Sequence, residues 1–172
     1  MLKKFIFSLA MIAVATTPAM AQNMVMAEEV IEAEEPDMVA APDFTLKNLE
    51  GNNVSLNEFQ GSWVVLDFWG SWCKWCIKGI PEMKAAYEAY KDLGFEIIGI
   101  DCGDTVETWK GAVERYGLPW VNVYNPEGSP LLKEYGVQGF PTKVIINPEG
   151  YIYDIVVGED PEFYNILKNL FF

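Results

Sequence analysis

Two cysteines separated by two residues, Cys73 and Cys76, are the side chains of this sequence whose type and spacing most directly indicate chemistry. They follow residues 63–69, an apolar run rich in β-branched and aromatic residues. Such a run, closed by Gly70-Ser71, is typical of a buried strand that ends in a turn. Beyond Cys76 the apolar residues recur at helical spacing. The pair is therefore expected where a strand gives way to a helix N-terminus, whose unpaired N–H groups and dipole stabilise a thiolate.

A thiolate is the form of cysteine that attacks disulfides, and a second nearby thiol can release the resulting mixed disulfide. We interpret the pair as a dithiol–disulfide exchange site. Cys73, at the helix start and on its exposed side, is expected to be the attacking thiol, and the more buried Cys76 the resolving thiol. A zinc half-site would need two further ligands, for which only Cys102 and carboxylates are available. A purely structural disulfide would close too short a loop to contribute much stability.

Composition narrows the remaining classes of function. The 172 residues contain no histidine, which excludes a Cys-His protease pair, a Ser-His-Asp triad and a histidine metal site. The formal net charge of −13 makes nucleic acid and anionic lipid headgroups poor partners. The odd number of cysteines, three, favours redox chemistry or a free thiol over a disulfide scaffold.

The N-terminal segment has the pattern of an export signal. Lys3 and Lys4 precede a short apolar run, and Ala19-Met20-Ala21 provides the small residues of a cleavage site. We expect residues 1–21 to be a cleaved signal peptide that leads to the periplasm, with an uncleaved anchor as the alternative. Residues 22–40 are acidic and lack aromatic residues, so we expect a flexible linker.

The rest of the chain, residues 41–172, is expected to form one domain in which strands alternate with helices. This alternation predicts a mostly parallel central sheet with an antiparallel end, covered on both faces. The expected strands are 44–49 and 54–56 (a hairpin), 63–69, 95–101, 120–124, and 143–146 and 151–157 (a second hairpin). The expected helices are 73–93, 105–116, a short one through 131–135, and a C-terminal one with Phe163, Ile166, Leu167, Leu170 and Phe171 on one face.

The run from Val65 to Cys76 resembles the active-site strand and turn of the thioredoxin superfamily, and Gly139-Phe140-Pro141-Thr142 resembles its cis-proline loop. With residues 41–44 and 146–150, the pattern is similar to exported TlpA/ResA-type thiol-disulfide oxidoreductases over about residues 40–172. The resemblance implies an α/β thioredoxin fold: a central mixed sheet flanked by helices, with an N-terminal hairpin and a central α/β insertion.

The resemblance also implies roles for individual residues. Asp67 matches the buried carboxylate behind the cysteines, which handles the proton of the resolving thiol. The local sequence agrees, because an acid in an apolar strand is costly to bury without a task and burial raises its pKa; an aspartate facing solvent is the alternative. Pro141 matches the proline that faces the cysteines, although a proline also suits a strand entry. We expect four residues to contact substrate: Trp72, Trp75, Phe140 and Pro141.

Four residues leave questions open. Many TlpA/ResA-type members carry an acidic residue three positions after the second cysteine, where this chain has Gly79. Between the cysteines, Lys74 should favour the Cys73 thiolate, whereas Trp75 could desolvate it and oppose this effect. Cys102 follows a strand expected to end at the same sheet edge as the pair. It is expected to be a small buried residue, with an accessory thiol or metal contact as the alternative.

Together these observations predict an exported enzyme that exchanges protein disulfides, with reduction as the expected direction. Because a periplasm is oxidising, a membrane-bound electron donor would have to re-reduce the pair. From the resemblance we expect clients among apocytochromes and other exported proteins, no cofactor or metal, no nucleic acid, and a monomer. The alternatives are a disulfide oxidase or isomerase and, further off, a thiolate metal-delivery module. A thiol peroxidase fits least, because no Pro/Thr-framed cysteine is present.

Overall fold

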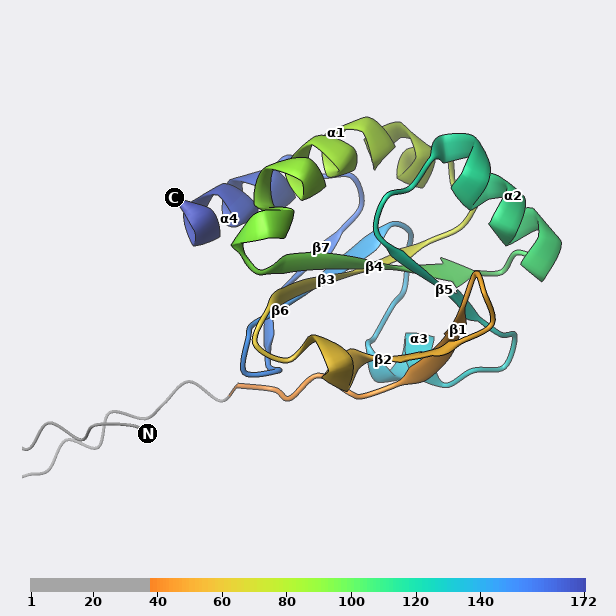
Figure 1. Cartoon of the computed structure of the whole chain (residues 1–172), viewed down its shortest axis with the longest axis horizontal. Coiled ribbons are helices and arrows are strands. Elements are labelled where there is room, and N and C mark those ends of the chain that lie inside the picture. The colour runs from red at the N-terminus through yellow and green to blue at the C-terminus, as the bar shows by residue number, and fades with distance from the viewer. Residues whose placement is uncertain (1–37) are drawn as a thin grey trace, which may run out of the picture. The chain divides into compact units, whose positions relative to one another are not determined.

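In residues 38–172, which the computed structural model describes, seven strands form one mixed sheet in the order β2-β1-β5-β4-β3-β6-β7 (Figure 1). The expected signal peptide and nearly all of the expected linker lie outside these residues. The strands are β1 (Thr45–Asn48), β2 (Asn53–Ser55), β3 (Trp63–Trp69), β4 (Phe95–Cys102), β5 (Val121–Asn125), β6 (Thr142–Ile146) and β7 (Ile152–Val157). The helices are α1 (Lys74–Tyr90), α2 (Val106–Tyr116), α3 (Leu131–Glu134) and α4 (Glu162–Phe171), with short 3-10 helices η1 (Leu56–Phe59) and η2 (Lys91–Leu93).

Strand β3 lies inside the sheet and is paired along its length on both sides. It runs parallel to β4, which runs parallel to β5, and antiparallel to β6. Antiparallel hairpins, β1–β2 and β6–β7, form the two ends of the sheet. The central parallel strands and antiparallel ends confirm the predicted mixed α/β sheet and its N-terminal hairpin. In the chain, α2, β5 and α3 form the α/β segment between β4 and β6.

Side chains of β3 alternate between two hydrophobic cores. Val65 and Trp69 pack with residues of α1, α2 and α4, whereas Leu66 and Phe68 pack with residues of η1 and α3. Figure 1 shows the same division, with α1, α2 and α4 over one face of the sheet and α3 below the other. The near-continuous apolar sequence of β3 follows from this burial on both faces.

Helix α2 illustrates how local sequence sets the bounds. Thr105 caps its N-terminus by accepting a hydrogen bond from Thr108 N, and Gly117 ends it with a left-handed φ of 57°. These caps match the predicted helix 105–116. The predicted helix 73–93 is divided instead, because the chain tightens into η2 after Tyr90. Leu56, expected in a strand, begins η1, where Ser55 and Glu58 form a capping box.

The described domain includes contacts slightly before the expected start at residue 41. Ile152 N donates a hydrogen bond to Val39 O, and Ala40 forms an isolated bridge with Tyr151. Among the described residues, no helix has the length and apolar character needed to cross a membrane.

Candidate active site

The cysteine pair lies where the sequence places it, between the end of β3 and the start of α1. Cys73 is the N-cap residue of α1, and its Sγ accepts a hydrogen bond from Cys76 N at 3.1 Å. The two sulfurs are joined in a disulfide, so the structure represents the oxidised form. After reduction, the same backbone N–H and the N-terminus of a 17-residue helix are placed to stabilise a thiolate on Cys73.

The exposures of the two cysteines differ from the sequence-based expectation. Cys73 is 5% exposed and Cys76 is 7% exposed, so in the oxidised form Cys73 is not on an exposed side of the helix. Both belong to the core cluster beneath α1, with Val65 and Trp69. The first turn of α1 packs directly on the sheet, which explains why helix position alone did not predict accessibility.

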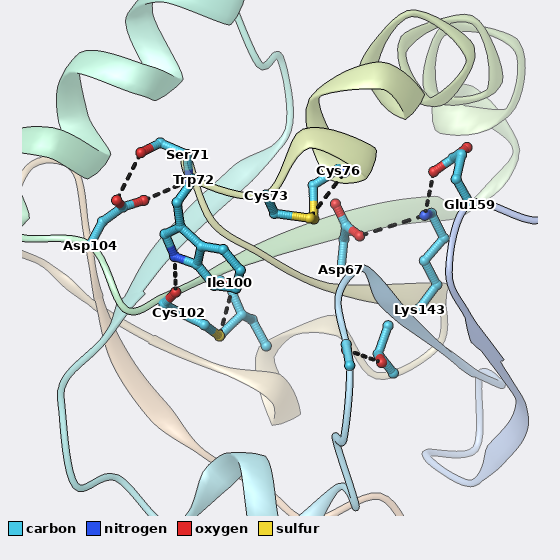
Figure 2. Close-up of a disulfide and its surroundings, with 12 residues drawn as sticks. Asp67, Ser71, Trp72, Cys73, Cys76, Ile100, Cys102, Asp104, Lys143 and Glu159 are labelled. Carbon is cyan, nitrogen blue, oxygen red and sulfur yellow. Dashed lines mark hydrogen bonds and ion pairs between the residues drawn. A yellow bond between two sulfur atoms is a disulfide. The ribbon is translucent and has the colours of Figure 1, made fainter.

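Asp67 is buried on the face of β3 that carries Val65 and Trp69, and its carboxyl group points toward the disulfide (Figure 2). Among the described residues its Oδ1 has no hydrogen-bond partner, and the nearest cation, Lys143 Nζ, is 3.9 Å away. Burial raises the pKa of Asp67, opposed by the charge of Lys143 and reinforced by that of Glu159. The structure thus places Asp67 in the interior, and not at a solvent-facing strand end.

Two charged residues that the sequence analysis missed lie next to Asp67. Lys143 is its direct cross-strand partner in β6 and is 2% exposed. Lys143 Nζ binds Glu159 Oε2 at 3.0 Å, and Glu159 comes from the loop between β7 and α4. The signal available in the sequence was a lysine at the start of the apolar run 143–146, since a lysine in a buried strand needs a partner. Nothing local to Glu159 indicated that it would be the partner.

The predicted substrate-contacting residues Trp72 and Phe140 lie against each other beside the disulfide. Their ring centroids are 5.1 Å apart in an edge-to-face arrangement. The Trp72 indole N–H donates to Cys102 O at 2.9 Å, while the ring remains 55% exposed. The Phe140–Pro141 peptide bond is cis, as the resemblance implied. Both aromatic rings border an open groove of about 660 Å³, whose other walls include Tyr124, Pro126 and Leu132.

The two residues between the cysteines are on the surface. Trp75 is 58% exposed and its ring lies 4.9 Å from Lys78 Nζ, a cation–π distance. Lys74 is also exposed. The lining of the groove includes Trp72 but not Trp75.

Cys102 is a buried free thiol on the other face of the sheet. It packs with Leu66 and Phe68, whereas the cysteine pair packs with Val65 and Trp69. Burial raises the pKa of Cys102 to about 12, and its Sγ donates to Ile100 O at 3.4 Å. This agrees with the expectation of a small buried residue. Within residues 38–172, no group of three or more Cys, Asp or Glu side chains is placed to hold a metal ion.

A second buried carboxyl group, Asp101, lies at the end of β4 opposite Trp69 of β3. It is fully buried, and neither oxygen has a hydrogen-bond partner among the described residues. Burial, followed by the nearby Asp104, raises the pKa of Asp101 to about 8. Asp104 itself accepts hydrogen bonds from the backbone N and side-chain Oγ of Ser71, which fixes the turn before Cys73.

Comparison with known proteins decides the family. The model of the AhpC/TSA family matches residues 39–155, which include the whole exchange site except Glu159. The chain belongs to this family, within the thioredoxin superfamily. Among curated members, the thiol-disulfide oxidoreductase ResA of Bacillus thuringiensis is 38% identical over 119 residues, covering 69% of this chain and 68% of the relative. ResA of Bacillus subtilis is 32% identical over 133 residues, covering 74% of each.

Solved structures of similar proteins agree. The thioredoxin domain of a thiol-disulfide oxidoreductase from Bacteroides vulgatus has a TM-score of 0.70 and 36% identity, covering 77% of this chain and 96% of that one. A Chlorobium tepidum protein described as a thiol:disulfide interchange protein DsbE has a TM-score of 0.71 and 30% identity. The match covers 77% of this chain and 92% of that one. Together with the Cys73–Cys76 pair, these relatives establish a protein-disulfide oxidoreductase with a thioredoxin fold.

The buried Asp101 generates a prediction about stability and pH. Its pKa rises on folding, so the folded state binds the proton more tightly than the unfolded state. Its contribution to the free energy of unfolding is therefore complete below about pH 4, the usual aspartate pKa, and is lost as the pH rises towards about 8. Asp101→Asn should flatten the fall in stability between these values, measured by urea unfolding of the oxidised protein. Asp154→Asn, at an exposed position, is the control. If Asp101→Asn leaves the slope of the free energy of unfolding against pH as it is in the wild type, the prediction is wrong.

Proposed function

We propose that this protein is exported and reduces disulfides of other exported proteins, with Cys73 as the attacking and Cys76 as the resolving thiol. The observation that carries the proposed direction is the charge around the pair. Two carboxyl groups, Asp67 and Glu159, share one buried ammonium group, Lys143. Because Lys143 already lies between two carboxyl groups, it gives little stabilisation to the thiolate that forms when the cysteine pair is reduced.

The charges near the cysteine pair affect the direction of electron transfer because they change the relative stability of the dithiol and disulfide forms. Strongly oxidising proteins of this kind stabilise their reduced form, so their disulfide accepts electrons readily. Here the Cys73 thiolate of the reduced form would lie near the buried carboxyl group of Asp67, and like charges in a low-dielectric interior repel. The helix N-terminus offsets part of this repulsion at Cys73. The balance favours the disulfide form, and therefore a protein that gives electrons away.

The reaction follows in two steps that conserve electrons and protons. The Cys73 thiolate attacks one sulfur of a substrate disulfide, forming a mixed disulfide and releasing the other substrate sulfur as a thiolate that takes a proton from water. Cys76 Sγ–H then gives its proton to the Asp67 carboxylate and attacks Cys73 Sγ. The Cys73–Cys76 bond forms and the bond to substrate breaks, and the second substrate thiolate takes up the proton that Asp67 releases, which restores the Asp67 carboxylate. The substrate gains two electrons and the pair loses two.

Substrate would approach along the surface that borders the cysteines. Trp72 and Phe140 form one wall, and an extended peptide beside Pro141 would add a backbone segment to the site. Because both cysteine residues are nearly buried, we expect a chain that fits against this wall to bring its own sulfur into line with Cys73. The exposed Trp75, outside the lining of the groove, offers a further apolar contact.

The cellular setting is part of the proposal. The lysines and cleavage motif of residues 1–21 support export to the periplasm, and an oxidising compartment requires a membrane-bound donor to re-reduce the pair. The resemblance to TlpA/ResA-type proteins supports cysteines of apocytochromes c among the clients. We propose that the protein acts as a monomer and without a cofactor.

The reduction potential tests the direction. At equilibrium with a dithiothreitol or glutathione buffer, followed by the fluorescence of the adjacent tryptophans, the pair should titrate near thioredoxin's value of about −270 mV. A value near the about −120 mV of a strong oxidant would overturn the proposed reductase and favour a disulfide oxidase. Cys102→Ser is the matched control, because this thiol is buried on the other face and should leave the potential unchanged.

Trapping tests the order of attack. Cys76→Ala cannot complete the second step, so it should accumulate covalent mixed disulfides with client proteins through Cys73. Cys73→Ala should accumulate few, and insulin reduction should be lost in both variants. Non-reducing gels followed by mass spectrometry would identify the adducts. Adducts formed mainly by the Cys73→Ala variant would reverse the assignment of the two thiols.

Processing tests the export. In a Gram-negative host, the full chain should be recovered from the periplasmic fraction with Gln22 as its first residue, determined by N-terminal sequencing. Replacing Ala19 and Ala21 with bulky residues should block cleavage, because signal peptidase sites require small side chains there. Recovery of the unprocessed wild type in the cytoplasm would rule the proposal out.

A further inference from the structure

Glu159 reaches the exchange site from a distant part of the chain. It lies in the loop between β7 and α4, and its side chain is 11% exposed. Its two oxygens have separate partners: Oε2 accepts from Lys143 Nζ at 3.0 Å, and Oε1 accepts from Tyr164 OH at 2.8 Å. Figure 2 shows Lys143 between Glu159 and Asp67, with an interaction drawn to each. A buried carboxylate held at both oxygens has one defined position.

Gly79 of α1 provides the space that this carboxylate occupies. A Cβ atom built on Gly79 would overlap Glu159 Oε2 and Cδ, and it would lie 2.7 Å from Oε1. Any side chain at this position would therefore displace the carboxylate. Gly111, a glycine within α2, shows that this is particular to Gly79, because a Cβ there would meet nothing within 4 Å.

Lys143 is shared unequally between the two carboxyl groups. Its Nζ lies 3.0 Å from Glu159 Oε2, within hydrogen-bond distance, but 3.9 Å from Asp67 Oδ1, beyond it. The lysine is 2% exposed and lies 5.4 Å from the centre of the Phe163 ring, so water offers it little alternative solvation. Lys143 therefore stabilises the Glu159 carboxylate more than the carboxyl group of Asp67, although Asp67 is the direct cross-strand partner of Lys143.

We propose that Glu159 is a positioning residue of the exchange site, which draws Lys143 away from Asp67, and that Gly79 is the gap in α1 that admits it. The proposal rests on disulfide exchange at the Cys73–Cys76 pair and is independent of the direction of electron flow proposed above. In this proposal Glu159 contacts neither cysteine and acts on the site through Lys143.

The presence of Glu159 gives Asp67 a higher proton affinity, because two effects both raise the pKa of Asp67. The Glu159 charge repels an ionised Asp67, and the displaced Lys143 stabilises it less. Besides Asp67 and Lys143, Tyr164 on α4 faces Glu159, and its pKa is raised by burial and by this carboxylate. The charge of Glu82 on α1 adds to the rise at Tyr164. A carboxyl group that holds its proton more tightly is a stronger base for the Cys76 thiol in the resolving step.

Removing the Glu159 charge tests the proposal. In Glu159→Gln, which keeps the size and a hydrogen-bonding group, the titration midpoint of Asp67 should fall by about one pH unit or more. The midpoint is measured from the carboxyl 13C shift in the oxidised protein, assigned with Asp67→Asn, and needs no turnover. The acidic limb of the pH–rate profile for reaction of the reduced protein with glutathione disulfide should move by the same amount. Glu162→Gln, an exposed glutamate on α4, is the control and should change neither.

Closing the gap tests the role of Gly79 without removing any charge. Gly79→Ala should push the Glu159 carboxylate off Lys143, let Lys143 approach Asp67, and lower the Asp67 midpoint in the same direction. Gly111→Ala is the matched control for a glycine-to-alanine change inside a helix. If the midpoint in Glu159→Gln equals that of its control, the positioning role is overturned. If Glu159→Gln shifts it and Gly79→Ala does not, the role assigned to Gly79 is wrong.

Discussion

The burial of Asp67 in the central strand is the constraint on which the rest of the site depends. β3 is covered on both faces, so an acid in it has little access to water and is stabilised either by holding its proton or by a nearby cation. The antiparallel register with β6 supplies that cation by placing Lys143 directly opposite. A parallel neighbour on that side would require a crossover connection, whereas the β6–β7 hairpin delivers the lysine and then leads directly to Glu159. The charge network therefore follows from the mixed topology of the sheet.

The same strand also fixes the redox pair. It ends at Trp69, and the turn held by Ser71 and Asp104 leads into the first residue of α1. Cys73 therefore has a fixed relation to Asp67, because both are attached to one rigid strand by a short, hydrogen-bonded segment. Sites that depend on proton transfer need this kind of precision, since the donor and acceptor must come within hydrogen-bond reach. The exchange chemistry thus depends on strand β3 more than on the loops around it.

The sequence predicted those parts of the molecule whose signals are local. The apolar run of β3, the caps of α2 and the C-terminal hairpin were predicted because each depends on neighbouring residues. The burial of Asp67 was predicted because the residue matches the buried carboxylate of the family it resembles and lies within an apolar run. Glu159 was not, because its role depends on a contact with Gly79 across 80 positions of sequence, and an ordinary loop glutamate carries no mark of it. The exposure of Cys73 was predicted wrongly, because packing of a helix start against a sheet is a tertiary property.

The position of Cys102 determines which internal disulfides the protein can form. Three thiols in one chain could form three different disulfides, and two of these would leave the active pair broken. Here the sheet separates Cys102 from the other two, and its high pKa keeps it protonated. Both features favour the Cys73–Cys76 disulfide over any internal disulfide that includes Cys102. The third cysteine therefore does not disturb the transfer of two electrons by the Cys73–Cys76 pair.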